Sequence, residues 1–178
     1  MKACIKHIFL AAMGTLGVFF FVTMQSCNED KCKSIVCAYG GVCKEGTCIC
    51  PAGYEGSQCE TITRQRYQGV WIVEEEGTSS MPARYEVNIS YGTTMTDILI
   101  TNFYNKIKVP VEARIKGDTM FIHNQIRDGY KINGIGILGK SLYYGENGVM
   151  NVRYTIEAPD GTIDDYGLNG GHVSIWNH

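Results

Sequence analysis

The larger part of this chain contains no cysteine. None follows Cys59, although the sequence holds eight in all, and six of them lie between Cys32 and Cys59. Such a concentration indicates either a disulfide scaffold or a metal site. The stretch lacks the Cys-x2-Cys knuckles, often joined by histidine, that zinc sites favour. We therefore predict disulfides, which persist in oxidising compartments outside the cytosol.

Patterns typical of nucleic-acid binding and of catalysis are also missing. The formal charge is −2, and removal of Lys2 and Lys6 with a cleaved leader takes it to −4 without leaving a basic run. A basic patch is the usual electrostatic footprint of a nucleic-acid partner, so we predict no such partner. Neither Gly-x-Ser-x-Gly nor His-Glu-x-x-His occurs. We predict no metal, no cofactor and no enzymatic activity.

An enzyme remains a minority hypothesis. It would need the carboxylates of Asp164 and Asp165 to converge with His172 in a cleft, with shifted pKa values. The competing interpretation is a polar loop.

The N-terminal segment 1–26 has the organisation of a signal peptide. Lys2 and Lys6 precede an uncharged apolar run, Ile8 to Val22. That run is shorter than the roughly 20 residues that a membrane-spanning helix needs. If the run is extended to Met24, it comes closer to that length, so the alternative that the segment is retained as a membrane anchor stays open.

The segment ending in Cys27 resembles a bacterial lipobox. It reads Thr-Met-Gln-Ser-Cys, with Gln25 a departure from the family pattern. The resemblance implies cleavage before Cys27 and a diacylglyceryl group on its sulfur, and acyl chains would anchor the protein firmly. Cys27 otherwise lacks a partner, since Cys4 leaves with the leader and the other six cysteines pair. The alternative is an ordinary signal peptide with a stray cysteine.

Residues 27–31 form an acidic tether. Asn28-Glu29-Asp30 resembles the signal that sends some bacterial lipoproteins to the outer face of the outer membrane. A short solvated tether explains the same residues equally well. We expect a cell-envelope protein anchored to the outer membrane, with exposure at the surface left open.

Residues 32–59 resemble an EGF-like module. The cysteines follow C-x4-C-x5-C-x4-C-x-C-x8-C, and Pro51, Gly53, Tyr54 and Gly56 precede the last one. Six cysteines allow many pairings. The resemblance implies the bonds Cys32–Cys43, Cys37–Cys48 and Cys50–Cys59, a positive φ at Gly56, and a role as a rigid spacer. Too few oxygen ligands precede the first cysteine or fill the short third-to-fourth loop for a calcium site.

Residues 60–65 make a short linker without glycine or proline, and residues 66–178 make a second domain. Apolar residues alternate with period two, which places one face of each strand inward. The clearest runs are Tyr85, Val87, Ile89, Tyr91; Val109, Val111, Ala113, Ile115; and Met150, Val152, Tyr154, Ile156. Further strand-like segments are Val70–Val73, Asp97–Phe103, Met120–His123, Ile132–Leu138, Leu142–Tyr144 and Val173–Trp176.

Turn signals separate these runs at regular intervals. They are Gly117-Asp118, Gly139-Lys140, Asn147-Gly148 and Pro159-Asp160-Gly161. Short strands spaced in this way predict a mainly β protein, with an antiparallel up-and-down barrel first and a sandwich second. Gly134 and Gly136 lie inside an alternating run and indicate a bulge or a tight bend.

Gly69-Val70-Trp71, at the start of the first strand, resembles the opening motif of the lipocalin/calycin family. The resemblance implies an eight-stranded barrel with Trp71 closing one end. The family's second motif, Thr-Asp-x-x-Tyr, has only the poor counterpart Asp164-Asp165-Tyr166. If the interior is hollow, Trp71, Tyr85 and Tyr154 are the residues we expect to line a ligand.

Two binding hypotheses follow for this lipid-anchored protein. In the first, the barrel binds a small or apolar ligand, since eight strands leave room for side chains or for one small ligand. In the second, the barrel is filled, and the protein is an adhesion protein that meets a protein or glycan through an exposed patch. The EGF-like module is a spacer in both.

Overall fold

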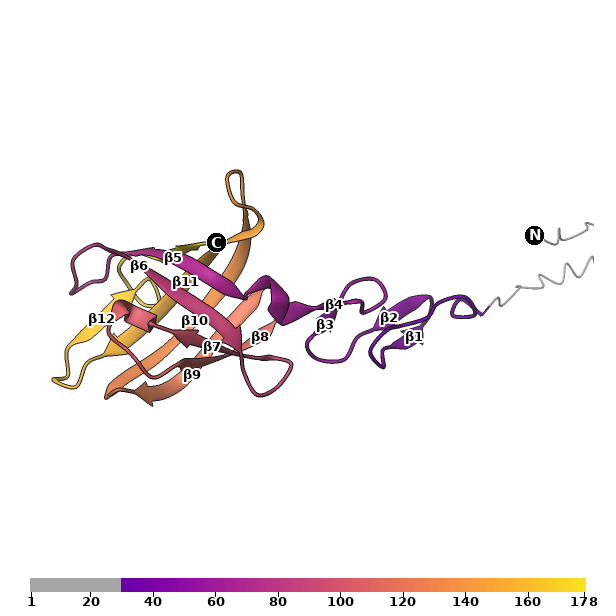
Figure 1. Ribbon diagram of the computed structural model, residues 1–178, viewed down its shortest axis with the longest axis horizontal. Coiled ribbons are helices and arrows are strands. Elements are labelled where there is room, and N and C mark those ends of the chain that lie inside the picture. Colours follow the sequence, from indigo (N-terminus) through magenta and orange to yellow (C-terminus); the bar gives the residue numbers. More distant parts are fainter. Residues whose placement is uncertain (1–29) are drawn as a thin grey trace, which may run out of the picture.

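The computed structural model describes residues 30–178. Cys27, the leader 1–26 and most of the tether lie outside the described residues. A slender N-terminal module joins one end of a β-barrel (Figure 1). We refer to that end as the proximal end and to the opposite end as the distal mouth. In the described part of the chain, no helix has the length and apolar character needed to span a bilayer.

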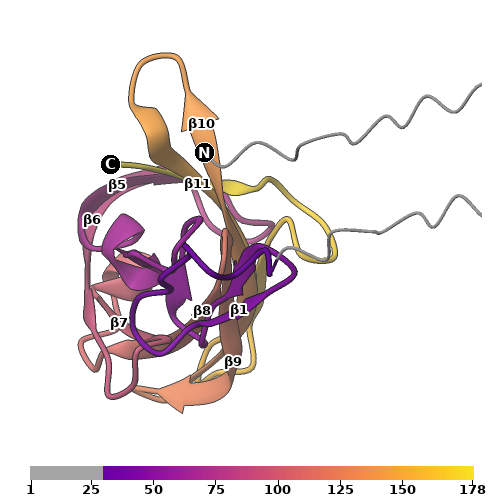
Figure 2. The same ribbon diagram turned by 90° about the vertical axis from the view of Figure 1, so that its right-hand side faces the viewer.

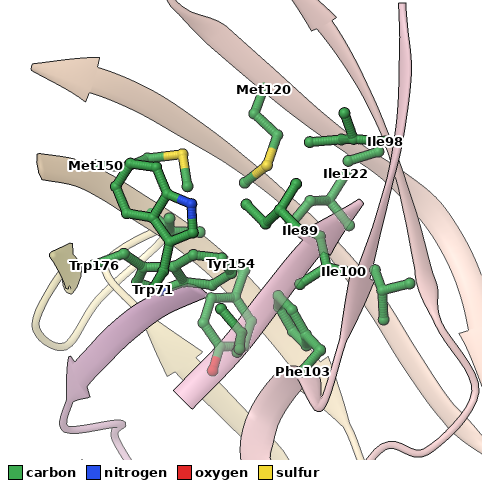
Figure 3. Packing of buried hydrophobic residues seen from close by; sticks show 14 of the residues in the cluster. Trp71, Ile89, Ile98, Ile100, Phe103, Met120, Ile122, Met150, Tyr154 and Trp176 are labelled. Atoms are coloured by element: carbon green, nitrogen blue, oxygen red, sulfur yellow. The ribbon is translucent and has the colours of Figure 1, made fainter. Parts of the chain in front are cut away.

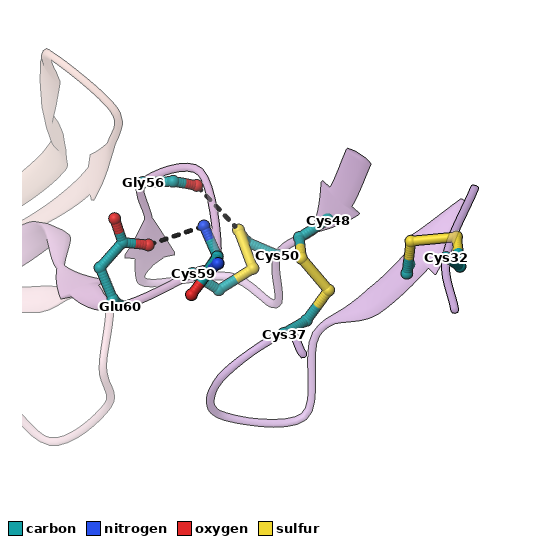
Figure 4. Close-up of a disulfide and its surroundings, with 9 residues drawn as sticks. Cys32, Cys37, Cys48, Cys50, Gly56, Cys59 and Glu60 are labelled. Carbon is teal, nitrogen blue, oxygen red and sulfur yellow. Dashed lines mark hydrogen bonds between the residues drawn. A yellow bond between two sulfur atoms is a disulfide. The ribbon is translucent and has the colours of Figure 1, made fainter. Parts of the chain in front are cut away.

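The N-terminal module consists of two small hairpins. Strands β1 (Val42–Lys44) and β2 (Thr47–Ile49) form the first, and β3 (Tyr54–Glu55) and β4 (Thr61–Ile62) form the second. Three disulfides hold them, with Cα–Cα separations of 5.8, 5.7 and 5.3 Å: Cys32–Cys43, Cys37–Cys48 and Cys50–Cys59 (Figure 4). This is the pairing that the resemblance of the cysteine spacing to an EGF-like module implied.

The module has almost no hydrophobic core of its own. Its buried hydrophobic residues are Cys48 and Cys59. A unit this small cannot bury enough apolar surface to fold unaided, so the disulfides must restrict its unfolded chain. Gly56 has φ +96°, as expected, and a Cβ there would meet the carboxylate of Glu60 at 2.5 Å.

The segment expected to be a plain linker is built into both domains. Thr61 and Ile62 pair with β3, and Thr63–Arg66 form the 3-10 turn η1 against the barrel. The guanidinium of Arg66 donates to Glu55 Oε2 at 2.9 Å, to Asp118 Oδ1 at 2.6 Å and to Asn147 Oδ1 at 3.0 Å. One side chain therefore ties the module to the turn that holds Asp118 and to the strand residue Asn147 of the barrel.

The barrel is closed, antiparallel and eight-stranded, so the first of the two predicted architectures is confirmed. Its strands are β5 (Gly69–Glu75), β6 (Ala83–Tyr91), β7 (Asp97–Thr101), β8 (Val111–Lys116), β9 (Thr119–Arg127), β10 (Tyr130–Ser141), β11 (Gly145–Glu157) and β13 (Ser174–Asn177). Consecutive strands pair from β5 to β11, and β13 pairs with both β11 and β5 to close the ring.

The last position of the ring is split. Strand β12 (Ile163–Tyr166) pairs with the distal part of β11, and β13 pairs with its proximal part. Residues 167–173 loop out between them. Because of this split, β12 brings Asp164 and Tyr166 to the distal end.

Four features differ from the sequence prediction. Val109 lies outside β8, because the N–H groups of Lys108 and Val109 donate to Asp128 Oδ2 instead of a strand partner. The turns predicted at Gly139-Lys140 and Asn147-Gly148 are wrong, since β10 and β11 run through them. The strand predicted over residues 142–144 is also wrong, because these residues form the turn at the tip of this long hairpin, which projects from the barrel (Figure 2).

Side chains fill the barrel interior. The largest fully buried ones include Trp71, Trp176, Tyr154, Phe103 and Met120, and they interlock across the barrel (Figure 3). The indole N–H of Trp71 donates to Tyr67 O at 2.8 Å, and that of Trp176 donates to Ser174 Oγ at 2.9 Å. Both tryptophans are therefore buried without an unpaired polar atom.

A β-bulge in β10 makes room for the side chain of Tyr154. The pairing of β10 with β9 shifts register between Ile132 and Gly134, at the place the glycines indicated. A Cβ on Gly134 would lie 2.5 Å from Tyr154 Cβ. The glycine thus lets Tyr154 sit against the backbone of the neighbouring strand.

Reduction should unfold the module and leave the barrel folded, because both tryptophans and the whole hydrophobic cluster belong to the cysteine-free barrel. With dithiothreitol, we expect tryptophan emission to stay at its buried wavelength while the module becomes sensitive to protease. A red shift of the emission on reduction alone would contradict this independence.

Replacing Arg66 by methionine keeps the aliphatic stem and removes the three hydrogen bonds at the junction. We expect the free energy of unfolding to fall by about 1–2 kcal/mol, and small-angle scattering to show a looser arrangement of module and barrel. Arg84→Met is the matched control, since Arg84 pairs with Glu74 where both side chains are more than half exposed. Equal effects of the two substitutions would refute the role of Arg66.

Candidate functional site

A hollow of about 590 Å³ opens at the distal mouth. The elements that line it, among them β12 and the β5–β6 loop, lie at the end of the barrel away from the disulfide-bonded module (Figure 1). Its walls come from the β5–β6 loop, the turn after β7, and the ends of β10, β11 and β12: Ser79, Ser80, Met81, Tyr104, Lys106, Tyr130, Ile156, Ala158, Pro159, Asp160, Thr162 and Asp164. Such a volume is in the usual range for small-ligand sites.

Tyr104 stands in this mouth on a strained backbone. It belongs to the 3-10 turn η2 (Phe103–Asn105), and its φ of +58° lies in the left-handed region. Asn102 and Asn105 on either side also have positive φ, at +62° and +53°. Asparagine tolerates this conformation, whereas a bulky residue such as tyrosine adopts it at a cost in free energy.

Neighbouring side chains hold the Tyr104 ring in place. Its centroid lies 6.0 Å from that of Tyr130 and 6.1 Å from that of Tyr166, both edge to face. The Nζ of Lys106 lies 4.9 Å from the ring centroid, and the hydroxyl lies 3.4 Å from Asp164 Oδ2. The turn and these contacts together fix one orientation of the ring.

Asp164 is the buried anion of the mouth. The side chain is 3% exposed, and burial by itself disfavours its charge. Hydrogen bonds outweigh this effect, because the N–H of Ser79 donates to Oδ1 at 2.8 Å and the hydroxyl of Tyr166 donates to Oδ2 at 2.9 Å. The net result is a pKa below the ordinary value of 3.8, so Asp164 is ionised at neutral pH.

A second buried carboxylate, Glu75, lies at the end of β5. It accepts hydrogen bonds from three hydroxyls, those of Tyr85 at 2.6 Å, Ser174 at 2.7 Å and Tyr154 at 3.0 Å. Removal from water raises its pKa above the ordinary 4.5, and the three hydroxyls only partly offset the rise.

Stacked aromatic rings link the two carboxylates. The rings of Tyr154 and Tyr166 lie parallel, with centroids 4.4 Å apart, and Phe103 packs edge-on against Tyr154 at 4.8 Å. Tyr154 donates to Glu75 and Tyr166 donates to Asp164. This layer separates the hollow from the apolar interior.

Of the three expected ligand residues, none lines the hollow. Trp71 and Tyr154 have no accessible surface, so no space as large as a water molecule adjoins them. Tyr85 is partly buried, and its hydroxyl donates to Glu75. Trp71 lies toward the proximal end beneath Tyr67, where the lipocalin resemblance implied a closing tryptophan.

The residues considered for catalysis have separate partners. Asp165 accepts the N–H groups of Leu168 and Asn169, and it holds the loop before β13 in shape. His172 is exposed, with Nδ1 3.4 Å from Glu76 Oε2. Within residues 30–178, no hydrogen bond or ion pair joins His172 to Asp164 or Asp165.

A glycine pattern that occurs in nucleotide-binding loops lies here within a strand. Residues 134–139 spell Gly-x-Gly-x-x-Gly. They lie inside β10 and are paired with strands β9 and β11 on its two sides. A nucleotide-binding loop must instead follow a strand and open a helix.

A second hollow, of about 240 Å³, lies on the outer wall across β7, β8 and β9. Its charged side chains already pair with one another, Arg114 with Asp97 and Arg127 with Glu112. The distal mouth differs because Lys106 is exposed there and, within residues 30–178, forms no ion pair. We therefore take the mouth as the candidate site.

Periodicity gave no signal for the mouth residues. Met81, Tyr104 and Lys106 lie in loops, outside the alternating runs that singled out Tyr85 and Tyr154. The sequence did contain one usable sign: two asparagines flank Phe103-Tyr104, and asparagine favours tight turns with positive φ.

Comparison with known protein families and solved structures found no match. No protein-family model matches the sequence, and no solved structure matches the fold.

Replacing Glu75 by glutamine should make the difference in stability depend on pH. Since burial raises the folded pKa of Glu75, ionising it costs folding free energy once the pH rises above 4.5. The wild type should therefore lose stability relative to Glu75→Gln as pH rises, measured by urea unfolding. Asp164→Asn should behave oppositely, because the lowered pKa of Asp164 stabilises the fold until the pH falls through it. A pH-independent difference for Glu75→Gln would contradict the assigned shift.

Proposed function

We propose that this chain is a non-catalytic binding protein of the bacterial cell envelope, lipid-anchored through Cys27, that meets its partner at the distal mouth of the barrel. The EGF-like module is the spacer between membrane and barrel. The partner is a protein or a glycan rather than an apolar molecule held in the interior. The single observation that carries this proposal is the contrast between a filled interior and an open mouth.

The filled interior supports the adhesion hypothesis over the interior ligand. Trp71, Trp176 and Tyr154 belong to the interior cluster and have no exposed area. An apolar ligand would have to displace them, at the cost of repacking a core of native density. A small ligand in the interior remains the second candidate, favoured by the lipocalin-like opening Gly69-Val70-Trp71 alone.

The direction of the molecule supports the same proposal. The described chain begins at Asp30, three residues after Cys27, and the module leads from there to the proximal end (Figure 1). Arg66 and η1 fix the module against the barrel, so the two parts extend along one line. A lipid on Cys27 would then place the mouth as far from the membrane as the chain allows.

The lipid anchor is tested by substitution at the cleavage site. Cys27→Ser should abolish incorporation of labelled palmitate and release the protein from the membrane fraction, because the sulfur is the acylated atom. Ser26→Ala is the control, since alanine suits the lipobox pattern and should retain both. Membrane-bound, acylated Cys27→Ser protein would contradict the anchor.

The mouth is tested by photo-crosslinking in intact cells of the source organism. Met81, on the rim, is 83% exposed, and Tyr143, at the hairpin tip, is 93% exposed. With p-benzoylphenylalanine at position 81, we expect a discrete adduct with an envelope component, and none at position 143. If position 81 gives no more adduct than position 143, the proposed binding surface is wrong.

A further inference from the structure

We infer that the ligand of the distal mouth is a carbohydrate, bound with a sugar ring against Tyr104 and Tyr130. This inference rests on the proposed function, and it names the chemical class of the partner. It is carried by the pairing of accessible aromatic rings with an exposed carboxylate and an exposed ammonium group, Asp160 and Lys106, in one open hollow.

The aromatic part of the hollow suits the C–H face of a sugar. Tyr104 and Tyr130 are both partly exposed and meet edge to face at 6.0 Å. A pyranose ring has an apolar face of C–H groups and a rim of hydroxyls. Aromatic rings carry a negative face that attracts such C–H groups, and their area is large for few rotatable bonds.

The polar part suits the hydroxyl rim. A carboxylate offers about four lone-pair positions, and Asp160, which is exposed on the rim, accepts the N–H of Thr162 at 2.9 Å and keeps other positions toward the hollow. The hydroxyl of Ser80 donates to that of Tyr166 at 2.6 Å, since Tyr166 gives its own proton to Asp164, and the Ser80 oxygen can still accept a hydrogen bond. Lys106 adds donors at the rim. Hydroxyl pairs on a sugar need this mixture of acceptors and donors side by side.

The same groups disfavour the other ligand classes. An apolar ligand would bury Asp164 further without giving its charge a hydrogen bond. An anionic ligand would meet two carboxylates, Asp160 and Asp164, against one lysine. Among the described residues, no group of three histidine, cysteine or acidic side chains could hold a metal ion. A neutral polyol satisfies the whole lining.

The strained turn supports a built site. Tyr104 keeps φ +58° although a bulky residue in that region costs free energy. Strain of this kind persists where surrounding contacts over-determine it, and here they fix the ring beside Tyr130. A ring held in its binding orientation loses little conformational entropy when a ligand binds.

The test is a glycan array probed with the full mature chain, followed by titration calorimetry on the best ligand. We expect binding to discrete glycans, with an affinity that falls about tenfold in Tyr130→Ala because the aromatic contact is lost; this fall corresponds to about 1.4 kcal/mol. Tyr104→Phe keeps the ring and should retain most of the affinity. Tyr143→Ala, an exposed tyrosine at the other end of the barrel, should bind as the wild type does.

Two results would overturn the carbohydrate assignment. One is no glycan binding by a chain whose tryptophan emission shows a folded barrel. The other is binding that Tyr130→Ala leaves unchanged or that Tyr143→Ala removes. An adduct from position 81 that contains protein and no sugar would reject the carbohydrate while leaving the proposed function in place.

Discussion

Close packing inside a closed β-barrel is the constraint on which the rest of this structure depends. Eight strands enclose a space that one set of large side chains can fill, and here Trp71, Trp176, Tyr154 and Phe103 fill it. Once the axis is occupied, a binding partner has to be met on the surface. The split between β12 and β13 then matters, because it delivers Asp164 and Tyr166 to the one end that stays open.

The buried carboxylates of the barrel, Glu75, Asp164 and Asp165, come from β5 and β12 at its distal end. Below it, the tryptophans find hydrogen-bond partners locally, and the remaining core is apolar. At the distal end, Glu75 and Asp164 are buried with tyrosine hydroxyls directed at them, a costly arrangement that requires full hydrogen bonding. The result is a rigid layer beneath a wet hollow, while disulfides and Arg66 fix the opposite end.

The regular parts of the fold were readable from the sequence, and the irregular parts were not. Period-two alternation placed Val87, Ile89, Val152 and Ile156 correctly in the core. The resemblance of the cysteine spacing to an EGF-like module implied the observed disulfide bonds. The long β10–β11 hairpin was missed because the dipeptides Gly139-Lys140 and Asn147-Gly148 are typical of turns, although here they lie inside strands. The mouth was missed because Met81, Tyr104 and Lys106 lie in loops and turns whose shape depends on tertiary contacts.

The central claim, a barrel with no room for an interior ligand, is tested most directly by tryptophan fluorescence during titration with a long-chain fatty acid. Both tryptophans are buried in the interior and pack within the same cluster (Figure 3), so a ligand held in the interior should change their emission. A filled interior predicts no saturable change in emission at any concentration below micelle formation. Saturable quenching with one-to-one stoichiometry would show that the interior opens to an apolar ligand and that the mouth is not the binding site.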